Sequence, residues 1–408
     1  MESTDRFREW FWQPPRAHGD IIRDRVVSPV ELLYDLVYVA AISQAAATMS
    51  AEVSITTFFR FATVFALIWL AWINGSLYLE LHGRDDGRTR SYVFIQIAIL
   101  SLLAIFAAQA PGADGTAFAI VYAAFLAVMT WLWQSVRFQD SPDFLAITRR
   151  YVVVMLASTV AIAVSALVPA ESRLAIWAAF AVLFVGFFAR EGFNPSFGRG
   201  VVPTRSMTER FGLFTIIVLG EVVIGVVDGV SHARRDALTI VTGVLALGIA
   251  FGFWWIYFDV IGNRLPRHTG RSVAGWTLIH LPITLAIAAT GAGMVGLLAH
   301  AADAKTPPEI AGLISGAVAS AMLCTIAATR ALVVYDRLSA VFQRMAAVMV
   351  VASVVALVVG YLAPAPPVLV LAFGAILTVT WLLAVRLYIH ANAWPPHELE
   401  RIEAVVEP

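Results

Sequence analysis

The stretch of sequence that decides the fold is TERFGLFTIIVLGEVVIGVVD, residues 208–228. It is apolar over a length that fits a membrane-spanning helix, which needs about 20 such residues. Glu221 interrupts it about 18 Å along the helix from Glu209, past the middle of a hydrocarbon core about 30 Å thick. A carboxylate at that depth is costly, so it normally faces a protein interior, a partner or water. Glu221 is therefore the first candidate for a functional residue.

Similar apolar stretches recur along the whole chain. Of its 408 residues, 60% are hydrophobic and 14% are charged, whereas soluble domains average about 25% charged residues. The expected spans are 30–49, 57–80, 91–110, 115–136, 151–169, 173–189, 208–228, 237–261, 273–299, 310–330, 345–363 and 367–389. They predict an all-α fold, a polytopic transmembrane helical bundle of about 12 spanning helices.

The arginines predict how these helices are oriented, because basic residues collect on the cytoplasmic side of membrane proteins. With the N-terminus placed in the cytoplasm, the basic residues that fall on the outer side are Arg60, Arg173, Arg234, Arg235 and Lys305, out of 28 in all. We therefore expect a multi-pass protein of the bacterial inner membrane with both termini cytoplasmic. The expected segments are a cytoplasmic N-terminal segment 1–29, a first six-helix half 30–190, a cytoplasmic linker 191–207, a second six-helix half 208–390 and a cytoplasmic tail 391–408.

Landmarks at helix ends repeat between the two halves at a nearly constant offset. Ser28-Pro-Val-Glu31 and Ser206-Met-Thr-Glu209 each fit a capping box, in which the Ser and Glu side chains bond amides of the first helical turn. Tyr78-Leu-Glu80 and Tyr257-Phe-Asp259 form a second pair at almost the same offset. We therefore predict a 6+6 parallel internal repeat, as in transporters whose halves are related by an axis along the membrane normal. Chance similarity of generic helix ends is the alternative.

Polar residues inside the apolar helices collect between the inner third and the middle of the membrane. On the first helix, Glu31, Tyr34, Asp35 and Tyr38 have the spacing that places side chains on one face. The candidates for an ion or substrate path are Glu31, Asp35, Gln44, Asn74, Gln96, Glu221 and His280. The candidates for structural or gating roles are Tyr34, Tyr38, Glu209, Arg210, Trp255, Tyr257, Asp259 and Pro282. Paired polar groups that only lock helices together are the competing interpretation.

His280 lies two residues before Pro282, which lacks an amide proton and favours a kink. Here the histidine could relay protons or bond Glu221, or it could simply be packed against a polar neighbour. A single histidine without nearby His or Cys ligands predicts no metal site. Since Walker, GxSxG and HExxH motifs are also missing from the sequence, we predict no cofactor and assign no catalytic residue.

Several of these stretches together resemble the low-temperature-requirement A (LtrA) family of bacterial membrane proteins. The matching stretches are Ser28–Gln44, Glu209–Glu221, Trp254–Asp259 and His280–Ile283, in the order that the family has them. The residues that carry over are Glu31, Asp35, Glu209, Arg210, Glu221, Asp259 and His280. The family name implies a link with growth in the cold, without a defined biochemical activity.

Three hypotheses about function follow. The leading one is a transporter or channel that moves an ion or a small solute along a polar, protonatable path between the two halves. The second is an intramembrane enzyme acting on a lipid or isoprenoid, with Glu221 and His280 as an acid–base pair. The third is a sensor or scaffold for cold adaptation that transports nothing. The expected partners are the bilayer and a small solute; zero net charge argues against nucleic acid, and an oligomer stays open.

Overall fold

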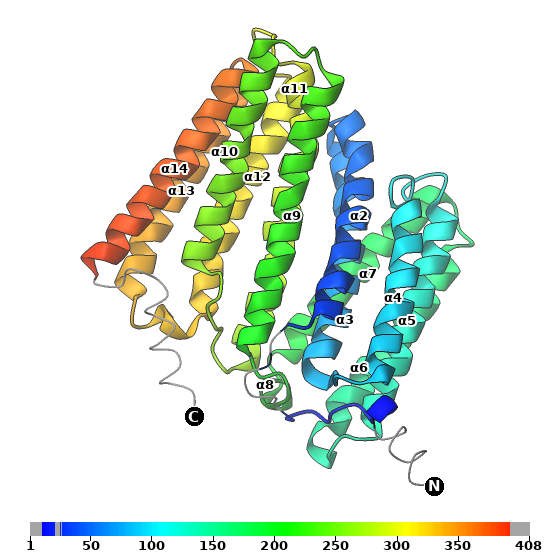
Figure 1. Ribbon diagram of the computed structural model, residues 1–408. Helices are drawn as coiled ribbons and strands as arrows, with labels where there is room; N and C mark the ends of the chain where they lie inside the picture. Colours follow the sequence, from blue (N-terminus) through cyan, green and yellow to red (C-terminus); the bar gives the residue numbers. More distant parts are fainter. Residues whose placement is uncertain (1–9, 21–24, 26, 392–408) are drawn as a thin grey trace. The chain divides into compact units, whose positions relative to one another are not determined.

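The computed structural model describes residues 10–20, 25 and 27–391. Its long helices are α2 (Pro29–Ala51), α3 (Ile55–His82), α4 (Gly87–Ala107), α5 (Gly115–Arg137), α6 (Pro142–Ser165), α7 (Ala170–Glu191), α9 (Arg205–His232), α10 (Ala237–Val260), α11 (Gly270–Ala299), α12 (Pro308–Ala328), α13 (Ser339–Leu362) and α14 (Pro366–His390). The short α8 (Pro195–Gly200) lies between α7 and α9 (Figure 1). The all-α prediction is confirmed: over the described ranges, twelve helices are long and apolar enough to cross a membrane.

Each predicted span coincides with one of these helices, although the fifth begins nine residues earlier than 151. Helix α6 starts at Pro142, a residue whose fixed φ favours the first helical position. The early start brings Arg150 into the helix, where its guanidinium makes two bonds to the Glu191 carboxylate, of 3.0 and 2.9 Å. A charge that would argue for a loop is therefore paired inside a helical segment.

The helices form two compact units. Unit 1 comprises residues 1–45, 60–210 and 268–274, and unit 2 comprises residues 46–59, 211–267 and 275–408. The boundary passes through α2, α3, α9 and α11, so that the first turns of α9, up to Arg210, belong to unit 1. The division into six-helix halves and the duplication both stay predictions.

In unit 1, α5 packs against α4 and α6. Its inward face is aromatic, and Phe118 and Tyr122 stack with ring centroids 6.1 Å apart. The Tyr122 hydroxyl donates to the Leu67 carbonyl at 2.9 Å. This bond satisfies a buried hydroxyl that would otherwise be costly among apolar side chains.

In unit 2, α12 packs against α13, and α10 against α14. Helices α9 and α11 approach until their backbones touch, because glycine lies at the crossing. A Cβ added to Gly291 would lie 2.5 Å from the carbonyl oxygen of Glu221, and one added to Gly225 would collide with the carbonyl of Gly291. Small residues are the usual means of such close packing in membranes.

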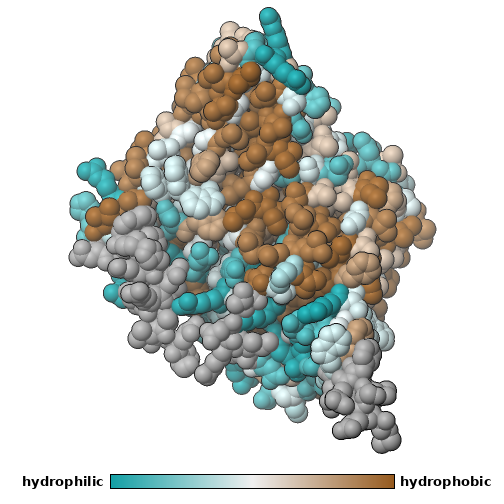
Figure 2. All heavy atoms as spheres, in the orientation of Figure 1, coloured by the Kyte–Doolittle hydropathy of each residue, from teal (hydrophilic) through white to brown (hydrophobic). Residues whose placement is uncertain are grey.

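The surface is that of a membrane protein. Figure 2 shows apolar side chains over the middle of the helices on the face in view, with hydrophilic side chains gathered toward helix ends. Exposed apolar side chains such as Phe94 on α4 and Val182 on α7 would face water in a soluble protein, whereas they suit a helix surface that contacts hydrocarbon.

Candidate functional site

The polar face of α2 is the centre of the site in unit 1. Glu31, Tyr34, Asp35 and Tyr38 are all buried, as their shared helical face predicts. The helix begins at Pro29, and the Ser28 hydroxyl donates to the Glu31 carboxylate at 3.0 Å. The two residues of the predicted capping box are therefore in contact, but this bond joins their side chains and not a side chain to a backbone amide.

Arg210 ties this face to the start of α9. The residue is 1% exposed, and its guanidinium donates to Glu31 Oε2 at 3.0 Å and to Asp35 Oδ1 at 3.2 Å. Asp35 Oδ1 also accepts the indole N–H of Trp72 at 2.9 Å. One arginine thus pairs with two carboxylates one helical turn apart.

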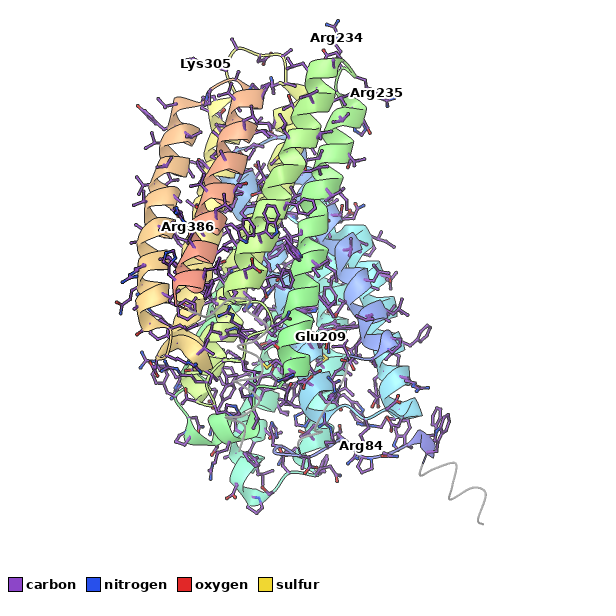
Figure 3. The ribbon with its side chains drawn as sticks, turned by 60° about the vertical axis from the view of Figure 1, so that its left-hand side comes forward. Arg84, Glu209, Arg234, Arg235, Lys305 and Arg386 are labelled. Carbon is purple, nitrogen blue, oxygen red and sulfur yellow. The ribbon has the colours of Figure 1, made fainter. Side chains whose placement is uncertain are left out.

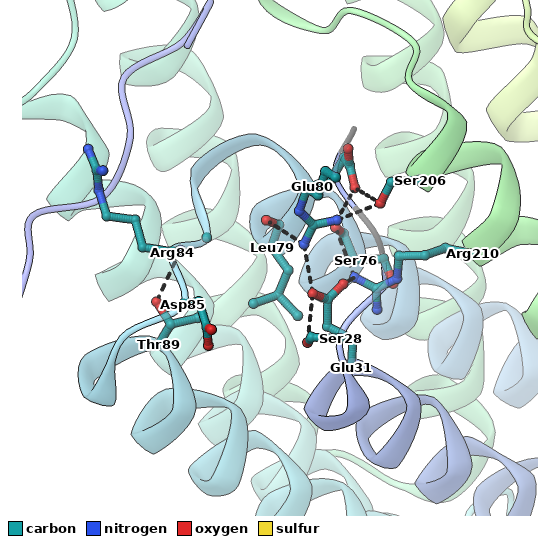
Figure 4. Close-up of polar contacts among 12 residues, drawn as sticks. Ser28, Glu31, Ser76, Leu79, Glu80, Arg84, Asp85, Thr89, Ser206 and Arg210 are labelled. Carbon is teal, nitrogen blue, oxygen red and sulfur yellow. Dashed lines mark hydrogen bonds and ion pairs between the residues drawn. The ribbon is translucent and has the colours of Figure 1, made fainter. Parts of the chain in front are cut away.

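A second arginine, Arg25, extends the network toward the end of α3. Figure 4 shows Glu31 and Glu80, the two carboxylates that it pairs with, together with Ser206 and Arg210. Arg25 lies 2.7 Å from Glu31 Oε1 and also pairs with Glu80. Glu80 accepts further bonds from the hydroxyls of Ser206, at 2.9 Å, and Thr204, at 2.7 Å. We call Arg25, Glu31, Asp35, Glu80 and Arg210 the charge network.

The predicted capping box at Ser206 and Glu209 is wrong. The hydroxyl that accepts the amide of Met207, at 3.0 Å, belongs to Thr204, because α9 starts at Arg205. Ser206 is thereby free to bond Glu80, and Glu209 is exposed. The neighbouring Arg210 points the other way, since adjacent helical residues do not share a face.

The other polar candidates of unit 1 form a neighbouring layer. The Tyr34 and Tyr38 hydroxyls are 2.8 Å apart, and Tyr34 packs against Gly75, where a Cβ would collide with its hydroxyl. The same added Cβ would lie 3.1 Å from Gln96 Oε1. Asn74 donates to the Leu70 carbonyl at 3.1 Å and accepts the Tyr151 hydroxyl. Gln44, by contrast, is exposed.

The buried polar atoms of unit 1 that have no hydrogen-bond partner among the described residues include four near the charge network: Asp35 Oδ2, Ser76 Oγ, Gln96 Oε1 and Arg210 Nε. A buried atom of this kind forfeits the bonds that it had in water. Asp35 Oδ2 is the most informative, because a carboxylate oxygen can accept a proton. Chemically, the site can hold a proton or exchange bonds between arginine and carboxylate.

Glu221 and His280, in unit 2, have different surroundings. Glu221 is buried where α9 crosses Gly291 of α11. His280 Nδ1 lies 2.6 Å from the Trp276 carbonyl and Nε2 lies 3.1 Å from the Tyr257 hydroxyl. Because a carbonyl only accepts, Nδ1 carries the proton and Nε2 accepts from Tyr257. Both ring nitrogens are thus engaged, while α11 continues as a helix through Pro282.

Aromatic residues cluster around the C-terminal end of α10 in unit 2. The rings of Trp255 and Trp381 stack with centroids 4.6 Å apart, and the Trp381 indole donates to Asp259 Oδ2 at 2.6 Å. Arg264 donates to the Asp259 carbonyl at 2.9 Å and lies over the Tyr388 ring. Asp35 and Glu221 belong to different units, and the prediction that they line one path stays a prediction.

A polar cluster around His18, which no sequence pattern indicates, ties residues 10–20 to the rest of unit 1. The backbone amide and ring of His18 each lie 3.0 Å from Asp140 Oδ1, and the Thr148 hydroxyl also donates to this carboxylate. Burial acts to raise the pKa of Asp140, but these bonds outweigh it and hold the pKa below its ordinary value. Arg16 bonds the Gly83 carbonyl at 2.9 Å. No local sequence pattern links His18 to a loop 122 positions away.

The described ranges contain no group of three His, Cys, Asp or Glu side chains placed to hold a metal ion. No solved structure matches the chain. A curated protein of Rhizobium meliloti (strain 1021), named only as uncharacterized, is 25% identical over 293 residues, which cover 66% of this chain and 69% of that protein. Residues 26–396 match the family described as Bacterial low temperature requirement A protein (LtrA). That match includes both units almost entirely, and the chain therefore belongs to the LtrA family.

Proposed function

We propose that this protein is a membrane transport protein that moves an ion or a small solute and uses the charge network of unit 1 as its protonatable element. The observation that carries the proposal is the Arg210–Asp35 ion pair, buried within helices that are long and apolar enough to span a membrane. Ionisable groups at such positions commonly mark substrate paths and proton relays.

The geometry supports a switch at Asp35. Its Oδ1 is bonded by Arg210 and Trp72, while Oδ2 has no partner within the described part of the chain. A proton on Oδ2 would neutralise the carboxylate and weaken its pairing with Arg210, which still has Glu31 as a partner at 3.0 Å. Protonation would thus redistribute the bonds of one arginine between two carboxylates, a change that can couple to helix movement.

Flux measurements on liposomes test this proposal. Protein is reconstituted with an internal pH-sensitive dye, and proton entry is followed under imposed proton, sodium and potassium gradients. We expect wild-type protein to accelerate proton movement, and Asp35→Asn to slow it by about tenfold or more. Glu209→Gln is the matched control, because Glu209 is an exposed carboxylate beside Arg210. Unchanged flux in Asp35→Asn, in a folded protein, would refute the role of the charge network.

We further propose that the protein lies in the bacterial inner membrane with both termini in the cytoplasm. The support is the arrangement of basic residues, because most of the 28 fall on one set of alternate loops. In unit 2, Arg234, Arg235 and Lys305 gather at one end, which this orientation places outside (Figure 3).

A further inference from the structure

Unit 2 contains a cavity of about 780 Å³, and Pro282 is the only site candidate from the sequence that lines it. Its walls come from the segment 53–59, from α11 around Leu285 and from α12. The lining is apolar apart from Ser54, Glu309 and Ser320. Its volume lies within the range of small-molecule sites, which is about 300–1,000 Å³.

The cavity is a groove along one face of α12. Glu309, Gly312, Gly316 and Ser320 follow one another at intervals of three or four residues, so they lie on one side of the helix. This row is about 16 Å long, from the helical rise of about 1.5 Å per residue. A Cβ added at Gly312 or Gly316 would meet no atom within 4 Å, and the two glycines therefore leave the groove open.

The groove has one charged end. Glu309, in the first turn of α12, lines the groove and is exposed. Lys305, in the preceding loop, is also exposed but lies outside the lining, four residues before Glu309 in the chain. Neither side chain makes an ion pair with another residue in the described ranges. A carboxylate and an ammonium group are thus both available where a membrane-spanning helix begins, at the level of lipid headgroups.

We propose that this groove binds one phospholipid with a primary ammonium headgroup, such as phosphatidylethanolamine. One acyl chain lies along Gly312 and Gly316, the headgroup ammonium pairs with Glu309, and its phosphate is close to Lys305. The bilayer supplies the occupant, because the groove opens on helices that hydrocarbon surrounds. Lipid tails are as apolar as the groove itself, so moving an acyl chain from the bilayer into the groove gives little free energy and does not distinguish one phospholipid from another. Selectivity therefore comes from the two charges and from the shape that the glycines leave.

Native mass spectrometry of the purified protein, with phosphatidylethanolamine, phosphatidylcholine or phosphatidylglycerol added at equal concentration, tests the proposal. The groove is filled by Gly312→Leu with Gly316→Leu. The matched control is Gly248→Leu with Gly374→Leu, two helical glycines of unit 2 that also have open space beside them but do not line the groove. Glu309→Gln removes the carboxylate with almost no change in shape.

We expect one phosphatidylethanolamine to remain bound to wild-type protein and to the control. The filled variant should lose it by about tenfold, the scale of about 1.4 kcal/mol in binding. Glu309→Gln should abolish the preference over phosphatidylcholine while a lipid can still enter. The proposal would be overturned if the filled variant retained phosphatidylethanolamine as well as wild-type protein does. It would also be overturned if the control variant lost this lipid to the same extent as the filled variant, or if wild-type protein preferred phosphatidylglycerol.

Discussion

Arg210 donates to Asp35 at 3.2 Å, although 175 positions separate the two residues in the chain. Both side chains are almost fully buried, and the same guanidinium holds Glu31 at 3.0 Å. A guanidinium suits this position because its fork of donors can reach two carboxylates, which the single ammonium of lysine cannot do with the same geometry. The pair thus fixes α2 against the first turns of α9 within unit 1, and it carries the proposed switch.

The first prediction concerns the removal of this arginine. Arg210→Met would leave the Glu31 and Asp35 carboxylates buried without their shared partner. Losing one member of a buried ion pair typically costs about 3–5 kcal/mol, because the remaining charge stays desolvated. We expect purified Arg210→Met in detergent to have a clearly lower midpoint of thermal unfolding than wild-type protein. The midpoint of Arg210→Lys should lie between those of wild type and Arg210→Met.

The control for this prediction is Glu209→Gln, one residue earlier on the same helix. Glu209 is exposed, so its substitution should leave the midpoint nearly unchanged. If Arg210→Met unfolded at the same temperature as wild type, the ion pairs would contribute nothing to holding α2 and α9 together.

The second prediction is a pH dependence at Asp140. Bonds from His18 and Thr148 outweigh burial and lower its pKa. Because the folded pKa lies below the unfolded value of about 3.9, the stabilisation by Asp140 is complete above that value and is lost only as the pH falls through the folded pKa. The stability difference between wild type and Asp140→Asn should therefore not shrink between about pH 7 and about pH 5.

Thermal unfolding of the two proteins across this pH range measures that difference. Asp143→Asn serves as the control, because Asp143 lies in the first turn of α6, is exposed and forms no ion pair with a described residue. If the stability difference had already disappeared at about pH 6, the Asp140 carboxyl would be taking up its proton well above the ordinary pKa of an aspartate, and the prediction would be wrong.

The spans were predictable from sequence because the signal is local: each helix must be apolar over its own length. The start of α6 was missed because the charge of Arg150 argued for a loop, and its partner Glu191 lies 41 positions away. The shared face of Glu31, Tyr34 and Asp35 also followed from helical spacing alone. Helical spacing cannot, however, say which arginine reaches that face.

The partners in the site were harder to predict because they depend on tertiary contacts. Glu209 and Arg210 are adjacent in sequence, yet one is exposed and the other is among the most deeply buried charges. In the sequence, Arg25 is simply a basic residue before the first spanning helix, and Glu80 is an acidic residue near the end of the second. Nothing local in the sequence indicated that they would form one network with Arg210.

The third prediction concerns orientation in the membrane. Cys324 is the only cysteine, so Cys324→Ser gives a background for single reporter cysteines. Asp303→Cys and Gln139→Cys place reporters in exposed loops that the arginine pattern assigns to opposite sides. In intact cells, a membrane-impermeant maleimide should label position 303 and reach position 139 only after permeabilisation. The reverse pattern would refute the proposed orientation.

The fourth prediction concerns the crossing of α9 and α11 in unit 2. A Cβ on Gly291 would lie 2.5 Å from the backbone oxygen of Glu221, and neither helix backbone can yield as a flexible side chain could. Gly291→Ala should therefore force the helices apart and lower stability by about 1–3 kcal/mol, the usual cost of overpacking. Gly248→Ala is the control, since its added Cβ meets nothing within 4 Å. There, alanine should be neutral or slightly stabilising through helix propensity, by up to about 1 kcal/mol. The thermal unfolding midpoints of Gly291→Ala and Gly248→Ala test this prediction when they are measured under the same conditions. If the two substitutions changed the midpoint equally, close packing at the crossing would not require glycine at position 291.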